Sequence, residues 1–234
     1  MFFDEYYLIL VVPTLILSVW AQFMVKSTFN KYSKVQSSRR ITGVDAAALL
    51  LKSNNISDVQ VEAVGGTLTD HYSPSDKKLR LSNPVYGETS IAAIGVAAHE
   101  AGHAIQHATR WGPLVLRSTL VPIANIGSRL GPWIAIAGLA ISSQEAYLGF
   151  ASILFTVGIL LFSGAVLFYL ITLPVEFNAS NRAIAILRAN NVLDESELNG
   201  VKKVLNAAAM TYVASALTAI ASLLRLILLS RRRR

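Results

Sequence analysis

The chain has 234 residues, of which 53% are hydrophobic and 15% are charged. Ordinary soluble domains carry about 25% charged residues, so this composition excludes such a domain and indicates an integral membrane protein. The net charge of +7 comes from basic residues that flank apolar segments, a pattern typical of contact with anionic lipid headgroups and not of nucleic-acid binding. Because cysteine is absent, disulfides and thiolate metal ligands are excluded.

The first apolar segment, Tyr7 to Val25, is uncharged and just long enough to cross a bilayer. Asp4 and Glu5 precede it, whereas a cleaved signal peptide begins with basic residues. Residues 1–25 are therefore expected to be a retained first transmembrane helix. Lysines and arginines follow between positions 26 and 40, and the positive-inside rule places this downstream side in the cytoplasm.

Residues 26–118 have the pattern of a small water-soluble unit. Thr42 and Asp45 resemble a capping box that opens a helix running to Leu51. Apolar and polar residues alternate from 59 to 63, which predicts a half-buried strand.

A β-hairpin is expected next, with strands at 67–69 and 79–82 around the polar turn 73–76. An edge strand beside a catalytic helix could pair with an extended peptide through main-chain hydrogen bonds. The alternative is a small hairpin that only covers the core.

The motif His-Glu-x-x-His lies within this unit, with His99, Glu100 and His103 as its defining residues. Ser90 is a suitable N-cap for a helix over 91–108, a stretch without proline. Two histidines four residues apart lie on one helix face and can share a tetrahedral zinc ion. The glutamate after the first histidine can then deprotonate a zinc-activated water.

His107 continues the same helix face, but it is about 12 Å along the axis from His99 at 1.5 Å per residue. Imidazoles this far apart cannot both bind one ion at about 2.1 Å. His107 is therefore expected to be structural or interfacial.

Residues 119–175 predict a transmembrane helical hairpin. Its two arms are Thr119 to Ile141 and the uncharged run Ala146 to Val175, joined by a polar turn that suits the outer face. The second arm delivers Glu176 back to the cytoplasmic side, where this carboxylate is the natural third ligand for the two histidines.

Residues 176–209 are expected to form a helical segment, in which Asp194 caps a further helix. Residues 210–234 form a C-terminal apolar helix with a basic tail. If this helix crossed the membrane, the four terminal arginines would lie outside, against the positive-inside rule. It is therefore expected to pack on other helices or to lie in the interface.

The motif segments also carry a family resemblance. LTDHY at 68–72, SIAAIGVAAHEAGHAIQ at 90–106 and LPVEF at 173–177 resemble the YugP-type neutral zinc metallopeptidases of bacteria, and the similarity covers nearly the whole chain. The order of motif, two spans and glutamate is more distantly similar to the HtpX and CAAX-prenyl membrane proteases.

In those more distant relatives the glutamate opens an ExxxD pattern, in which the aspartate supports a ligand histidine. The resemblance thus implies Glu176 as third zinc ligand and places Ser180 at the aspartate position. Ser180, Asn178 or Asn181 could take over the support of a histidine.

Three further side chains are candidates for stabilising a developing oxyanion: His71, Tyr72 and Tyr86. The ordinary alternative for each is an exposed turn residue.

The resulting fold hypothesis is a mainly α membrane protein, with three to four transmembrane helices and a small α+β zincin-like cytoplasmic unit carrying a β-hairpin. The functional hypothesis is a membrane-bound endopeptidase with one zinc ion and Glu100 as general base, acting on membrane-associated proteins or peptides at the cytoplasmic surface. One alternative is a catalytically inactive zinc-binding membrane adaptor, and another is a transport component whose histidines handle metal ions. The oligomeric state is left open.

Overall fold

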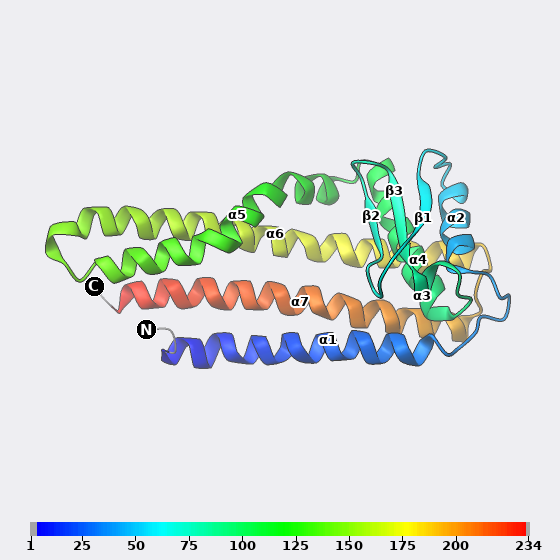
Figure 1. Ribbon diagram of the computed structural model, residues 1–234, viewed down its shortest axis with the longest axis horizontal. Coiled ribbons are helices and arrows are strands. Elements are labelled where there is room, and N and C mark those ends of the chain that lie inside the picture. Colours follow the sequence, from blue (N-terminus) through cyan, green and yellow to red (C-terminus); the bar gives the residue numbers. More distant parts are fainter. Residues whose placement is uncertain (1–3, 233–234) are drawn as a thin grey trace. The chain divides into compact units, whose positions relative to one another are not determined.

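The computed structural model describes residues 4–232, so Arg233 and Arg234 of the basic tail lie outside the described residues (Figure 1). In chain order the elements are η1 (Tyr7–Val11), α1 (Val12–Tyr32), α2 (Gly43–Ser53), β1 (Gln60–Val64), β2 (His71–Ser73), β3 (Lys78–Ser82), α3 (Asn83–Tyr86), α4 (Ile91–Ala108), α5 (Gly112–Ile141), η2 (Glu145–Tyr147), α6 (Leu148–Ala189) and α7 (Glu195–Arg231). The protein is thus mainly helical with one small sheet, as the sequence predicts.

The chain divides into two compact units. The helical unit comprises Met1–Trp20, Leu116–Leu173 and Thr211–Arg234, and the mixed unit comprises Ala21–Val115 and Pro174–Met210. Three helical stretches of the described chain are long and apolar enough to cross a membrane, namely Tyr7–Tyr32, Glu145–Ala189 and Glu195–Arg231. The protein is a membrane protein of the predicted class.

The mixed unit contains a three-stranded sheet in the order β1-β3-β2, with β1 parallel and β2 antiparallel to β3. The strand at 60–64 and the hairpin are present, but the first hairpin strand is His71–Ser73, so the predicted strand at 67–69 is wrong. Leu68 has a φ of 58° and Gly66 a φ of 101°. These left-handed conformations turn the chain and are incompatible with an extended strand.

Local capping starts the helices of the mixed unit where the sequence predicts. The Thr42 side chain accepts from the Asp45 backbone N–H, and the Asp45 side chain accepts from the Thr42 N–H, which completes the capping box of α2. Ser90 accepts from the Ala93 N–H and caps α4. The register of the histidine-bearing helix is therefore fixed from its first turn.

In the helical unit α5 and α6 form a helical hairpin whose backbones approach at glycines. Of its two arms, α6 is among the described helices long and apolar enough to cross a membrane and α5 is not, so the predicted first transmembrane arm stays a prediction. A Cβ added at Gly138 would lie 2.7 Å from the Ala151 carbonyl oxygen, and one at Gly158 would lie 2.7 Å from that of Gly131. Small residues at such contacts are typical of packing between membrane helices, where van der Waals contact replaces the hydrophobic effect.

The last apolar segment is continuous with the helix that Asp194 precedes, and it packs on the N-terminal helix as one of the two predicted outcomes. The Arg225 guanidinium lies 2.6 Å from the Asp4 carboxylate, and the Ser18 and Thr218 hydroxyls lie 3.3 Å apart. Because Arg225 has a carboxylate partner, its presence in an apolar helix does not argue against crossing. By length and composition α7 could cross a membrane, although the charge pattern of the sequence predicted that it does not.

Candidate metal centre

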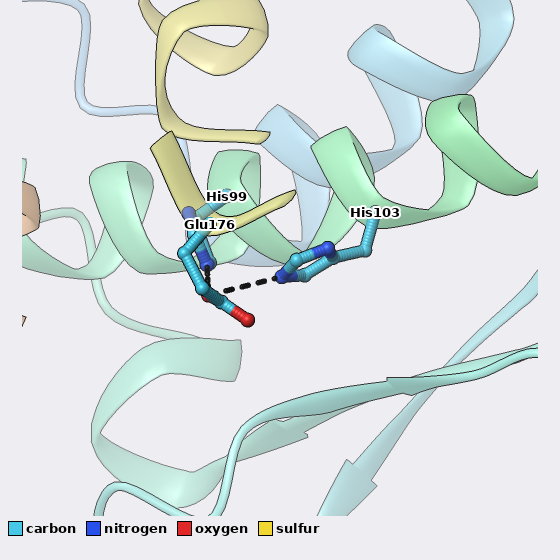
Figure 2. A group of neighbouring side chains, drawn as sticks. All are labelled: His99, His103 and Glu176. Carbon is cyan, nitrogen blue, oxygen red and sulfur yellow. Dashed lines mark ion pairs between the residues drawn. The ribbon is translucent and has the colours of Figure 1, made fainter. Parts of the chain in front are cut away.

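The two motif histidines and Glu176 converge in the mixed unit. His99 and His103 extend from successive turns of α4, and Glu176 comes from α6. The Nε2 atoms of both rings face one oxygen of the Glu176 carboxylate, at 3.3 Å from His99 and 3.5 Å from His103 (Figure 2). Within residues 4–232, this is the group of His, Asp and Glu side chains whose ligand atoms lie close enough together, within 4.8 Å, to hold one metal ion.

The spacing of these atoms fits a zinc ion. Two ligand atoms at about 2.1 Å from a tetrahedral zinc lie about 3.4 Å apart, close to the two measured separations. The same separations are long for hydrogen bonds, which prefer about 2.9 Å. Two nitrogens and one carboxylate oxygen also form a typical catalytic zinc donor set that leaves a fourth position open.

A close approach of two helices brings the ligands together. A Cβ added at Gly102 would lie 2.6 Å from the Ala179 carbonyl oxygen, so α4 and α6 are in backbone contact at this point. Gly102 precedes His103, and Ala179 lies one turn beyond Glu176. Only glycine permits this contact, which sets the distance between the imidazoles and the carboxylate.

Each ligand histidine has a partner on its other ring nitrogen. The Nδ1 of His99 lies 3.0 Å from the Ser180 hydroxyl, and the Nδ1 of His103 lies 3.0 Å from Gln106 Oε1. Such contacts orient metal-bound imidazoles. Ser180, the residue at the relatives' aspartate position, is therefore well placed to support His99.

The two asparagines proposed as alternative supports are placed differently. Asn178 Oδ1 accepts hydrogen bonds from Gln106 and from Arg182, so it reaches the ligands only through Gln106. Asn181 is exposed on α6.

Glu100 lies on the same helix and is almost fully buried. Its Oε2 accepts a hydrogen bond of 3.0 Å from the Tyr72 backbone N–H in β2. β2 is an edge strand whose Tyr72 pairs with Leu79 of β3. The Glu100 carboxylate, which is expected to act as the base, binds to the edge of β2 that faces away from β3. This contact fixes the carboxylate against the sheet.

The three oxyanion candidates lie in different surroundings. The exposed His71 ring nitrogen Nδ1 lies 2.8 Å from the Thr69 carbonyl oxygen, and Tyr86 packs against the hydrophobic core. The Tyr72 hydroxyl lies 2.8 Å from His107 Nδ1, which gives His107 the structural role expected of it. Burial, with the charges of Asp58 and Asp76, raises the pKa of Tyr72 to about 12, so this phenol stays protonated near neutral pH.

The electrostatics at His103 raise the pKa of its imidazole. Burial alone disfavours the charged imidazole, but the nearby carboxylates of Glu176 and Glu100 outweigh it and raise the pKa of His103 above its usual value. Metal binding at this position therefore competes with protonation of the imidazole, as is usual for histidine ligands.

The features of the centre that sequence reasoning missed are Gln106, the Gly102 contact and the Tyr72 N–H. Gln106 could have been found, because a residue three positions after His103 shares its helix face. The other two depend on segments far apart in the chain, and the sequence carries no direct signal for them.

Replacing Gly102 with alanine should weaken zinc binding, because the added methyl group forces α4 and α6 apart. Overpacking of this kind costs about 1–3 kcal/mol. Thermal unfolding and zinc titration of the purified protein would measure both effects. Gly87→Ala is the matched control, since a Cβ there meets no atom within 4 Å; equal zinc affinity in the two variants would contradict the packing argument.

Ser180→Ala should lower zinc affinity by up to about 10–100-fold through loss of support for His99. Ser180→Asp should raise the affinity above that of the wild type, because a carboxylate makes the imidazole a more basic ligand. Competition with a chromophoric chelator would rank the three proteins. Identical dissociation constants would show that Ser180 does not act on His99.

Comparisons with known proteins agree with this centre. Residues 7–231 match the family model described as "Putative neutral zinc metallopeptidase". The chain is 48% identical over 223 residues to the "Putative membrane protease YugP" of Bacillus subtilis (strain 168), and the match covers 95% of this chain and 96% of that protein. No solved structure matches. With its three ligands at zinc-like spacing, the chain belongs to this family of neutral zinc metallopeptidases.

Proposed function

We propose that this protein is a membrane-bound zinc endopeptidase that cleaves proteins or peptides at the cytoplasmic surface of the membrane. The observation that carries the proposal is the convergence of His99, His103 and Glu176 with Glu100 one residue from a ligand on the same helix. A zinc site with only a structural role does not require such a carboxylate.

The chemistry follows from the arrangement of these residues. Bound zinc supplies a Lewis acid that polarises a peptide carbonyl and lowers the pKa of water. Glu100 takes a proton from the attacking water and transfers it to the departing amine. The hydrogen bond from the Tyr72 N–H holds one oxygen of Glu100, which leaves the other available for this proton.

The edge strand β2, whose Tyr72 N–H is donated to Glu100, supports a mode of substrate binding. A peptide in extended conformation can add to an edge strand through main-chain hydrogen bonds. β2 is at the edge of its sheet and is joined through Tyr72 to the proposed base. A substrate paired with β2 would therefore lie beside the residue that activates the water.

The sequence around Glu176 supports a substrate held near the bilayer. Glu176 is the first charged residue after the uncharged run from 146 to 175. A helix of this length extends for about 45 Å at 1.5 Å per residue, and the hydrocarbon core needs only about 30 Å. The ligand thus follows a membrane span closely without needing to enter the hydrocarbon.

Glu100→Gln should retain zinc and abolish peptide hydrolysis, because the amide keeps the shape of the side chain but cannot accept the proton. General-base catalysis contributes about 10²–10⁴-fold, so the loss should be at least of that order. The measurement is casein digestion by the purified protein, with zinc content determined in parallel.

A chelator should abolish the wild-type activity, and added zinc should restore it. His99→Ala is the control that loses both zinc and cleavage. Undiminished cleavage by Glu100→Gln would remove Glu100 as the base. Zinc binding without cleavage by the wild type would instead favour the inactive adaptor.

The cytoplasmic orientation can be tested because the chain lacks cysteine. Ser75→Cys places a thiol in the exposed turn between β2 and β3, and Ser143→Cys places one in the exposed turn between α5 and α6. A membrane-impermeant thiol reagent should label position 143 in intact cells and position 75 only after permeabilisation. The reverse labelling would overturn the orientation.

A further inference from the structure

Gln106 is a fully buried amide in contact with both ligand-bearing helices. It lies on α4, one turn after His103, and its side chain is completely inaccessible to solvent. Its Oε1 lies 3.0 Å from His103 Nδ1. Its Nε2 donates to the Val175 carbonyl oxygen at 2.8 Å and to Asn178 Oδ1 at 3.0 Å.

The partners determine which end of this amide faces the histidine. A backbone carbonyl only accepts hydrogen bonds, so the atom of Gln106 that faces Val175 is the NH2 group. The Asn178 atom is an oxygen, because it also accepts from Arg182 Nε at 2.8 Å, and a guanidinium only donates. Both hydrogens of the Gln106 amide are thereby used, and Oε1 faces His103.

The proton position on His103 follows from the orientation of the amide. An amide oxygen accepts only, so Nδ1 of His103 must carry the hydrogen. In the neutral ring Nε2 then presents a lone pair toward the Glu176 oxygen 3.5 Å away. Two acceptors facing each other need a proton or a metal ion between them, and a metal ion bound by both side chains would occupy this position.

We propose that Gln106 is the positioning residue of the metal centre, holding His103 in the Nδ1–H form and tying it to the backbone next to Glu176. Val175 immediately precedes Glu176, so one side chain aligns ligands from two helices. The inference rests on the proposed function only for the presence of a metal, and it does not require that peptides be cleaved.

The hydrogen-bond network beyond Gln106 ends in a positively charged side chain. It runs from His103 through Gln106 and Asn178 to the guanidinium of Arg182. Carboxylate partners make a ligand imidazole more basic, and this network contains none. His103 is therefore oriented without gaining donor strength, which leaves more of the positive charge on the metal.

The test uses the full-length protein in detergent, loaded with zinc and labelled with 15N-histidine. The chain has four histidines, and His103→Asn identifies the signal of His103. In the wild type, His103 should show a hydrogen on Nδ1 that exchanges slowly with water. Gln106→Met should lose this slow exchange and bind zinc about 10–100-fold more weakly, the usual effect of removing such a partner.

Ile105→Val is the matched control, because it trims the neighbouring buried side chain without touching His103; it should keep both the signal and the affinity. Gln106→Glu retains an acceptor for Nδ1 and should keep the slowly exchanging hydrogen, which tests the proposal even if the methionine variant fails to fold. A wild-type His103 protonated on Nε2, or an unchanged signal and affinity in Gln106→Met, would overturn the proposal. These readouts are independent of Glu100→Gln and of any substrate.

Discussion

The backbone contact between α4 and α6 is the constraint on which the metal centre depends. With glycine at 102, the Ala179 carbonyl reaches a position that any side chain would block. Each imidazole then lies at the separation from Glu176 that two ligands of a tetrahedral zinc require. The alanines of α4 from Ala92 to Ala104 are buried almost completely, so this helix packs closely against its neighbours elsewhere too. The geometry of the centre is therefore a consequence of small residues as much as of its ligands.

The surroundings of the ligands are built from neutral groups. A serine hydroxyl contacts His99, and an amide contacts His103, where many zinc sites use carboxylates. The carboxylates of the centre are thus Glu176, the proposed ligand, and Glu100, the proposed base. Glu100 is held by a backbone N–H of the edge strand. An extended peptide pairing with that strand would act directly on the group that orients the proposed base, so substrate binding and base positioning would be physically coupled.

In the helical unit the main constraint is the packing of apolar helices in lipid. Glycines along α5 and α6 allow close backbone contact. The Arg225 side chain of α7 is paired with Asp4 near the other end of the sequence. An ion pair of this kind removes the main objection to placing an arginine in a membrane helix, and it joins α7 to the segment just before the N-terminal helix.

The sequence by itself determined the membrane class, the capped start of α4 and the spacing of His99, Glu100 and His103, because these depend on composition and on contacts within a few residues. Glu176 was also predictable, since a carboxylate directly after a long apolar run is expected where a membrane span returns to the water. The tertiary structure decided the strand at His71–Ser73, where Leu68 adopts a left-handed conformation, and the hydrogen bond from Tyr72 to Glu100. It also decided the contact of Gly102 with Ala179 and that of Gln106 with Val175. These contacts join residues 28 or more positions apart, and the strand depends on a single backbone angle. Neither leaves a periodic pattern in the sequence.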